Sequence, residues 1–301
     1  MNFSSFIARR YFLSKKKKNF INVISIISMI AVAVGTMSLV IVLSVFNGLE
    51  DFIRSLYNSF DPQLKVVPVT GKSFEISENM LSDLDSINGI EYITQVIEDN
   101  AYVKYRDAEM VVKVKGVDDN FLKEERLRNN IVEGELKLRE GNFNYAIIGR
   151  GVQYTLNLSS LKDIYPLQFY YPKKRRRSGL DPTGSINRMN IMPTGVFAIE
   201  KQYDMNYILV PLDFAAGLTE YNNKRTSLEI KVIEETSIDG IKNKIQNFLG
   251  PDFQVLDSDE QHASFLRAIK VEKLFVYLTF SFIIAVAAFN IFFALTMLAN
   301  C

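Results

Sequence analysis

Two long uncharged segments dominate the hydropathy pattern of this chain of 301 residues. No charged residue occurs in residues 19–49 or 274–301, although 23% of the chain is charged. A helix needs about 20 mostly apolar residues to cross a bilayer, and both segments are longer. A buried core helix usually keeps a polar stripe, and the apolar part of a cleaved signal peptide has only about 7–15 residues. We therefore predict transmembrane helices at residues 19–49 and 271–301.

Helical periodicity continues outside both segments. Apolar residues recur at helical intervals after the first segment and before the second: Phe46, Leu49, Ile53 and Leu56, then Phe265, Ile269 and Leu274. The first pattern should end at Asp61, because Pro62 follows and the residue before a proline avoids the helical region. We expect each span to extend as a helical stalk beyond the membrane.

Between the spans, in residues 50–270, the pattern changes to short runs rich in β-branched and aromatic residues. These runs predict strands at residues 63–69, 92–96, 101–105, 110–117, 145–148, 167–171, 196–200, 207–210 and 227–232. Helices are predicted at residues 77–87, 212–221 and 237–249, the last one closed by Gly250 and Pro251. The sequence thus predicts an α+β domain of one or two subdomains between two transmembrane α-helices.

Basic residues predict the orientation of the chain. Arg9, Arg10 and the four lysines of residues 15–18 precede the first span, and short basic flanks stay in the cytoplasm. The N-terminus is therefore expected inside and residues 50–270 outside the cytoplasm. Residues 1–18 are either a short amphipathic helix in the membrane interface or a disordered basic tail.

The sequence offers no familiar catalytic or metal site. The only cysteine, Cys301, ends the second predicted span, so neither a disulfide nor a Cys-His pair is expected in the domain. A zinc site needs three or four ligands, and His262, the only histidine, is expected to be a solvated helix residue. We predict no catalytic residue, metal or cofactor.

The cytoplasmic segment of residues 1–18 is too short for a folded ATPase. The chain either anchors an external module or is one part of a machine whose motor is another polypeptide.

A basic run lies within the predicted external domain, at residues 173–177. It follows the predicted strand at residues 167–171, and prolines and glycines punctuate the stretch of residues 172–193. This composition is typical of a hairpin loop. The predicted orientation argues against nucleic acid as a partner. A solvated hairpin tip and a docking site for a partner protein remain equally open.

Four motifs then narrow the choice. They are FIARRY at residues 6–11, SVFNGLE at 44–50, IGRGV at 148–152, and IAVAAFNI at 284–291 followed by LTML at 295–298. In this order they resemble the permease subunits of lipoprotein-releasing ABC transporters, the LolC/LolE type, within the MacB/FtsX-like group. Members have four spans, the first two flanking a large periplasmic domain. On this resemblance we expect the chain to be incomplete after its second span.

The resemblance implies a transport function without catalysis by this chain. Two permeases, the same or homologous, would assemble with the dimer of a separate ATPase in the bacterial inner membrane. A lipoprotein would enter from the outer leaflet and pass to a periplasmic carrier. The alternatives are efflux as in MacB, regulation as in FtsX, and a two-span structural or sensor protein anchored in membrane lipid.

The two predicted spans contain candidate residues for acyl-chain binding and for helix packing. Exposing an acyl chain to water costs about 0.8 kcal/mol per CH₂, so extraction needs an apolar lining. Four residues near the outer end of the first span are candidates for it: Val42, Val45, Phe46 and Leu49. Packing against a neighbouring helix is the alternative for each. Small or hydrogen-bonding residues are candidates for helix packing: Ala31, Gly35, Ala287, Ala288 and Asn290.

The resemblance implies that a protruding hairpin of the periplasmic domain docks the carrier. Residues 172–193 occupy the matching place in this chain, although their basic run departs from the family pattern. The candidate docking residues are Lys173, Lys174, Arg175, Arg176, Arg177 and Arg188.

Overall fold

The computed structural model describes residue 6 and residues 20–57, 60–161, 163–173, 186–234 and 236–299. The chain divides into two compact units. One consists of Met1–Ile53 with Ala263–Cys301, and the other of Arg54–His262. The predicted basic run at Lys174, Arg175, Arg176 and Arg177 lies outside the described residues.

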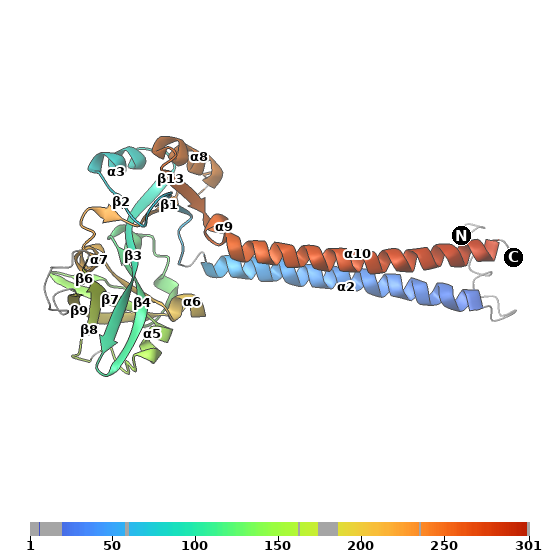
Figure 1. Cartoon of the computed structure of the whole chain (residues 1–301), viewed down its shortest axis with the longest axis horizontal. Coiled ribbons are helices and arrows are strands. Elements are labelled where there is room, and N and C mark those ends of the chain that lie inside the picture. Colours follow the sequence, from blue (N-terminus) through green and yellow to red (C-terminus); the bar gives the residue numbers. More distant parts are fainter. Residues whose placement is uncertain are drawn as a thin grey trace. The chain divides into compact units, whose positions relative to one another are not determined.

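Two long helices form the first unit. Helix α2 spans Phe20–Tyr57, of which the last turn belongs to the other unit, and α10 spans Ala263–Ala299. Within them, Ile26–Tyr57 and Ala263–Phe293 are long and apolar enough to cross a membrane. The helices lie side by side (Figure 1). Most of their large apolar side chains are exposed, as expected of surfaces that face lipid.

A narrow seam joins the two helices. On α10 the less exposed positions recur every three or four residues: Lys273, Val276, Phe280, Ile284, Ala287 and Ile291. This spacing places them on one face of the helix. A Cβ atom built on Gly35 of α2 would lie 3.3 Å from Ile284 Cγ1. The absence of a side chain at Gly35 therefore allows the helices to approach closely.

The unit Arg54–His262 is an α+β domain built on an 11-stranded sheet. The main path of the sheet runs β13-β1-β12-β3-β4-β10-β7-β9-β5, with β6 paired to β7 and β8 paired to both β3 and β9. The strands are β1 (Leu64–Pro68), β3 (Ile90–Tyr105), β4 (Ala108–Val117), β5 (Ile131–Gly134), β6 (Arg139–Glu140), β7 (Phe143–Gly149), β8 (Leu167–Pro172), β9 (Ile186–Phe197), β10 (Tyr207–Pro211), β12 (Ser227–Val232) and β13 (Phe253–Asp257). A separate two-stranded ladder joins β2 (Phe74–Glu75) to β11 (Lys224–Arg225).

Short helices flank this sheet. They are α3 (Glu78–Asp85), α4 (Asn120–Lys123), the 3₁₀ helix η1 (Arg128–Asn130), α5 (Arg150–Thr155), α6 (Lys201–Asp204), α7 (Leu212–Thr219), α8 (Ile238–Leu249) and α9 (Ser258–Gln261). Helix α8 begins at a serine N-cap, where the Ser237 hydroxyl accepts from the Gly240 N–H, and it ends at Gly250 with φ of 75°. This positive φ is a backbone conformation that glycine adopts without strain.

Strand β3 connects two halves of the domain. Its first half pairs with β12 and its second half with β8, while β4 pairs with residues 96–105. The first half shares a core with α3 and α8 that contains Leu84, Ile230 and Ile241. The second half shares a core with α7 that contains Val103 and Phe214. One long strand thus runs through both cores.

Most predicted elements occur with shifted ends. The strands predicted at residues 92–96 and 101–105 are parts of the single strand β3, because its ladder with β4 continues through residues 97–100. The strand predicted at residues 196–200 is wrong beyond Phe197, where β9 ends. Glu200 instead caps α6, its carboxylate accepting from the Gln202 N–H.

Candidate functional site

A polar contact joins the helices where the first uncharged segment ends and the second begins. Lys273 Nζ on α10 donates to Asn47 Oδ1 at 2.8 Å and lies 3.0 Å from Glu50 Oε2, both on α2. Asn47 and Glu50 are one helical turn apart, so their side chains share a face. Both belong to the SVFNGLE motif. Sequence reasoning did not identify this contact, although the turn spacing and the lysine at the edge of the second span were signals for it.

The predicted acyl-chain residues divide between two sides of α2. Val45 and Leu49 are 64% and 44% exposed. Val42 and Phe46 are half-buried, one turn apart on another side of the helix. The structure therefore presents two of the four to the surroundings, and acyl-chain binding by any of them stays a prediction.

The predicted packing residues also divide. Gly35 and Ala287 are buried between α2 and α10. Ala31, Ala288 and Asn290 are exposed, so they take no part in the seam of this helix pair. Their role in packing against other helices stays a prediction.

The predicted hairpin is built from β8 and β9. These strands pair antiparallel up to Pro172 opposite Ile186, at the two ends of the undescribed residues 174–185. Lys173 directly follows β8. Arg188 on β9 donates to Gln168 Oε1 at 2.9 Å, and its guanidinium lies 5.3 Å from the centre of the Tyr170 ring. These contacts hold Arg188 against the hairpin stem.

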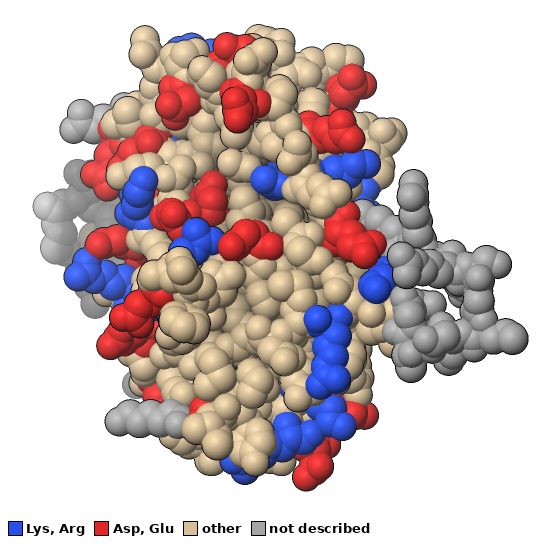
Figure 2. Space-filling view, turned by 90° about the vertical axis from the view of Figure 1, so that its left-hand side faces the viewer, with Lys and Arg blue, Asp and Glu red and all other residues tan. Residues whose placement is uncertain are grey.

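An aromatic hollow of about 310 Å³ lies at the base of this hairpin. Its lining residues are Tyr102, Tyr170, Tyr171, Pro172 and Ile186. The rings of Tyr102 and Tyr170 meet edge to face with centroids 5.9 Å apart. On the face drawn in Figure 2, acidic and basic side chains are interspersed.

A carboxylate anchors one wall of the hollow. The hydroxyls of Tyr171 and Tyr221 donate to Asp99 Oδ2 at 2.8 and 2.9 Å. Burial alone would raise the pKa of Asp99, but these hydrogen bonds outweigh it and lower the pKa. Burial, together with the Asp99 charge, raises the pKa of Tyr171. Tyr171 therefore stays neutral and its ring is fixed.

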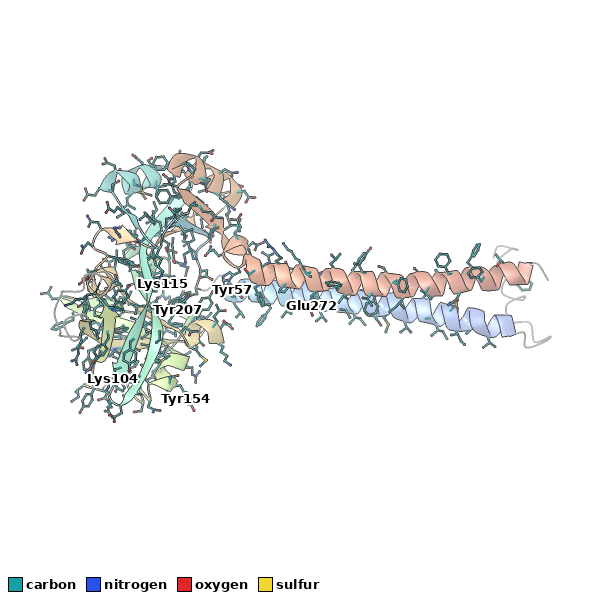
Figure 3. The ribbon with its side chains drawn as sticks, in the orientation of Figure 1. Tyr57, Lys104, Lys115, Tyr154, Tyr207 and Glu272 are labelled. Carbon is teal, nitrogen blue, oxygen red and sulfur yellow. The ribbon has the colours of Figure 1, made fainter. Side chains whose placement is uncertain are left out.

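A buried ionic network crosses the middle of the sheet. Lys115 on β4 and Glu229 on β12 are fully buried, with Nζ and Oε1 2.8 Å apart. Arg126 lies 2.7 Å from the other oxygen of Glu229 and 2.8 Å from Glu124. Lys115 lies inside the domain (Figure 3). Burial would raise the pKa of Glu229, but the charges of Lys115 and Arg126 lower it to about 2.

His262 is not the solvated residue that the sequence predicted. Its Nε2 lies 2.6 Å from Asp61 Oδ2, and its ring stacks on Tyr57 with centroids 3.6 Å apart. Asp61 also accepts a hydrogen bond from the Tyr203 hydroxyl. The prediction failed because Asp61 lies 201 residues away in sequence, so no local pattern shows the pair.

The residues that the structure describes contain no group of three or more His, Cys, Asp or Glu side chains that could hold a metal ion. The carboxylates of the clusters described above lie instead beside lysine, arginine, tyrosine and histidine side chains.

Two candidate membrane-spanning helices that enclose an α+β domain define a membrane protein with a large domain outside the bilayer. Residues 25–248 match the family model of the MacB-like periplasmic core domain, and the chain belongs to this family. The resemblance predicted from the four motifs is confirmed.

Known proteins resemble the chain over nearly its whole length. The lipoprotein-releasing system transmembrane protein LolC of Buchnera aphidicola subsp. Schizaphis graminum is 25% identical, over 97% of this chain and 70% of that protein. The LolE protein of Haemophilus influenzae is 23% identical, over 99% of this chain and 71% of that protein. The chain is thus an ABC-transporter permease with a MacB-like periplasmic domain.

Solved structures also align with the chain. The periplasmic region of MacB from Actinobacillus actinomycetemcomitans is 10% identical with a TM-score of 0.49, over 69% of this chain and 94% of that one. The extracellular domain of the transporter YknZ is 10% identical with a TM-score of 0.44, over 64% of this chain and 99% of that one.

Proposed function

We propose that this permease extracts lipoproteins from the outer leaflet of the bacterial inner membrane and passes them to a periplasmic carrier. The observation that carries the proposal is similarity over nearly the whole chain to LolC and LolE proteins, both of which are lipoprotein-releasing transmembrane proteins by name. The match includes both helices as well as the domain, so it is not limited to the domain fold.

The proposed assembly adds a separate ATPase and a second permease to this chain. The basic residues Arg9 and Arg10 favour a cytoplasmic N-terminus and a periplasmic domain. Energy would come from the dimer of a separate ATPase, because extraction of acyl chains is unfavourable by about 0.8 kcal/mol for each CH₂ that water contacts. A second permease, the same or homologous, would complete the membrane part.

The apolar surface of the helix pair supports a lipid-modified substrate. Val45 and Leu49 are exposed on α2, adjacent in sequence to Asn47 and Glu50, which bind Lys273. An acyl chain could lie along the exposed valine and leucine while the polar contact keeps the helices together. We propose Val45 and Leu49 as acyl-chain contacts on this ground.

The β8–β9 hairpin supports carrier docking. Lys173 and Arg188 supply positive charge near the stem, and the aromatic hollow lies between its strands and β3. Tyrosine and arginine are among the residue types enriched at the positions that dominate binding energy in protein interfaces. We propose that the carrier contacts the hollow and Arg188 together.

Depletion of the protein tests the proposed function. Spheroplasts of depleted cells are incubated with purified carrier, and lipoprotein released into the supernatant is quantified by immunoblotting. The proposal expects lipoproteins to accumulate in the inner membrane and release to stop. Leu49→Glu should lower release because it places a charge among the apolar contacts, while the control Asp51→Asn should not. Normal release after full depletion would contradict the proposal.

The match to the MacB-like domain also favours efflux as a second candidate function. The same depleted cells distinguish lipoprotein release from efflux. Normal lipoprotein release combined with increased sensitivity to an exported compound would favour efflux.

A further inference from the structure

The stem of the β8–β9 hairpin is tied to the rest of the domain by side chains of both its strands at one level. Tyr171 on β8 and Asn187 on β9 lie opposite each other in the antiparallel ladder. The Tyr171 hydroxyl donates to Asp99 Oδ2 on β3 at 2.8 Å. The Asn187 side-chain amide donates to the backbone oxygens of Gly217 and Leu218 on α7 at 2.7 and 2.9 Å. We call Tyr171 and Asn187 the anchored pair.

Helix α7 is a well-packed support for Asn187. Its residues Phe214, Ala215 and Leu218 are buried in the core shared with β3, and the helix contacts both β8 and β9. Gly217 and Leu218 lie in its last turn, where carbonyl groups have no partner within a helix. The Asn187 amide therefore satisfies acceptors that the helix itself leaves open.

The Asp99 carboxylate accepts three hydrogen bonds. Besides Tyr171, the Tyr221 hydroxyl donates to Oδ2 at 2.9 Å and the Asn100 N–H donates to Oδ1 at 2.9 Å. Hydrogen bonds to an ionised acceptor are about twice as strong as those between neutral groups. Tyr221 is buried and follows the end of α7 by two residues. Both members of the anchored pair are thus connected to α7 or to the segment directly after it.

The neighbouring pair of the ladder, Tyr170 and Arg188, lies on the opposite face of the stem. Successive residues of a strand alternate between the two faces, and these residues pair next to the anchored pair. Tyr170 meets Tyr102 at the aromatic hollow, and Arg188 is exposed. Neither Asp99 nor Asn187 lines the hollow. These two residues therefore hold the stem without forming its exposed face.

From this geometry we infer that Asp99 and Asn187 are positioning residues, which hold the β8–β9 stem in the direction in which it docks the carrier. The inference rests on the proposed function in taking this hairpin as the docking element. Without the two anchors the stem samples several directions, and only a fraction of the molecules is competent to bind. The apparent affinity falls by that fraction.

This role has a kinetic signature that differs from the loss of a contact. A smaller competent fraction lowers the association rate constant, because fewer encounters meet a correctly directed hairpin. The complex, once formed, keeps all its contacts and dissociates as before. Removing a direct contact changes mainly the dissociation rate constant. Variants of Asp99 and Asn187 should therefore differ in kind from variants of Arg188.

Spin-label distances test the anchor in the absence of any carrier. The full-length protein in nanodiscs carries Cys301→Ser, with labels at Lys173→Cys, directly after β8, and at Lys244→Cys, exposed on α8. Double electron–electron resonance should give a narrow distance distribution, which becomes broader in Asp99→Ala and in Asn187→Ala. Asn190→Ala, at an exposed position of the same strand, is the matched control and should leave it narrow. Unchanged distributions in both anchor variants would overturn the inference.

Binding kinetics test the consequence for docking. The probe is the purified, lipid-free periplasmic lipoprotein carrier, measured by biolayer interferometry on the same nanodiscs without labels. Asp99→Ala and Asn187→Ala should each lower the association rate constant about three- to tenfold, with little change in dissociation. Asp99→Asn keeps one acceptor oxygen and should recover part of this loss. Should Asp99→Ala fail to fold, Tyr221→Phe removes one donor to the carboxylate and keeps the ring.

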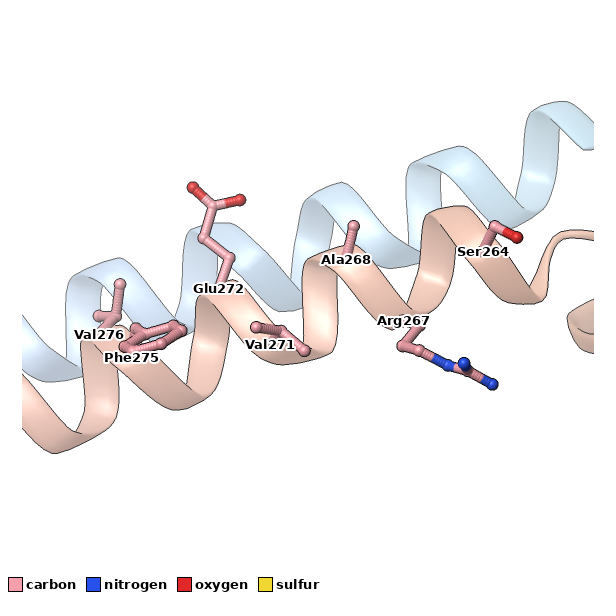
Figure 4. A pocket seen from close by; sticks show the side chains of 7 residues that line it. All are labelled: Ser264, Arg267, Ala268, Val271, Glu272, Phe275 and Val276. Carbon is pink, nitrogen blue, oxygen red and sulfur yellow. The ribbon is translucent and has the colours of Figure 1, made fainter.

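Two arginine variants complete the comparison. Arg188→Ala should raise the dissociation rate constant, because it removes a proposed carrier contact. Arg267→Ala removes an equal charge from α10 and should change neither rate constant. In Figure 4 the Arg267 side chain points away from α2, and it lies in the other compact unit. An equal effect of both variants would attribute binding to net charge and would overturn the docking direction.

The two measurements separate this inference from the proposed function. A native protein that does not bind the carrier would refute carrier docking, and the distance distributions would then decide on the anchor alone. Broadened distributions with native association rates in both anchor variants would overturn the positioning role and leave the proposed function intact.

Discussion

Arg126 donates a hydrogen bond from Nη1 to the backbone carbonyl oxygen of Phe60 at 3.1 Å. Phe60 follows the end of α2 by three residues and is almost completely buried. Its ring lies 4.4 Å from the Lys115 ammonium, an arrangement that favours a cation–π interaction. Arg126 and Lys115 both bind Glu229. The buried network therefore holds the segment after α2 as well as joining β4 to β12.

Glu229→Gln should destabilise the domain strongly. It leaves Lys115 and Arg126 buried with too little negative charge, a change that typically costs about 3–5 kcal/mol. For a domain of this size we expect the unfolding temperature of the full-length protein in detergent to fall by about 10 °C. The exposed Glu234→Gln is the control and should leave the temperature unchanged. Equal temperatures for the two variants would contradict this account.

The pKa of the Glu229 carboxylate predicts how the stability of the domain depends on pH. The pKa of Glu229 is about 2 in the folded protein and about 4.3 in an unfolded chain. The unfolded state thus binds the proton more tightly, and Glu229 stabilises the fold fully above pH about 4.3. That contribution declines as the pH falls from about 4.3 to about 2. Acid titration followed by circular dichroism should show a shallower decline for Glu229→Gln than for the native protein.

Removing the contact between His262 and Asp61 should lower the local stability of the region around it. The hydrogen bonds from His262 and Tyr203 outweigh burial and lower the pKa of Asp61. His262→Ala removes one of these bonds and the stacking on Tyr57, and should destabilise this region by about 1–3 kcal/mol. Hydrogen exchange at residues 60–66 should become faster.

Two further variants separate the two contacts of His262. His262→Phe keeps an aromatic ring and His262→Gln keeps a hydrogen-bond donor, so each should be milder than alanine. Native exchange rates in His262→Ala would show that the contact does not support this region.

Gly149 explains part of the IGRGV motif. A Cβ atom at Gly149 would lie 2.2 Å from the backbone oxygen of Asp204, and one at Gly151 would lie 2.6 Å from Met205 Cγ. Gly149→Ala should therefore force α5 away from the end of α6 and destabilise the domain by about 1–3 kcal/mol. Gly240→Ala, where a Cβ meets nothing closer than 3.6 Å, is the control. Thermal unfolding compares the two, and equal stabilities would refute the steric account.

The sequence predicted the features that local patterns encode. The length of the two uncharged segments predicted both long helices, and runs of β-branched residues predicted most strands. Each of these signals lies within one continuous stretch of the sequence. The predicted end near Asp61 also agrees with a helix that ends at Tyr57. The edge strand β13 was missed, since Phe253–Asp257 is short and follows directly on the turn at Gly250.

The polar contacts could not be predicted because their partners are distant in the chain. Lys115 and Glu229 lie on strands that are not neighbours in sequence, and residue type alone would place both at the surface. Only the sheet order, with β3 between β4 and β12, brings them together. In the SVFNGLE motif, Asn47 and Glu50 contact Lys273, which lies more than 220 residues away in the sequence.

Lys273 should stabilise the helix pair through Asn47 and Glu50. Asn47 lies near the end of the first uncharged segment and the two charged residues flank the segments, where water competes less well for the charges. Lys273→Ala removes both hydrogen bonds, and we expect a local loss of about 1 kcal/mol. Amide exchange in residues 45–52, measured by mass spectrometry on the protein in nanodiscs, should then rise roughly fivefold.

Two comparisons make this expectation specific to the contact. Lys270→Ala removes an equal charge three residues away, and no described residue forms an ion pair with Lys270, so exchange in residues 45–52 should not change. Lys273→Glu should increase exchange more than alanine does, because it places two carboxylates together. Adding Glu50→Lys to it restores opposite charges and should reverse most of that increase. An equal effect of Lys270→Ala and Lys273→Ala would attribute the stabilisation to net charge at the membrane surface and not to this contact.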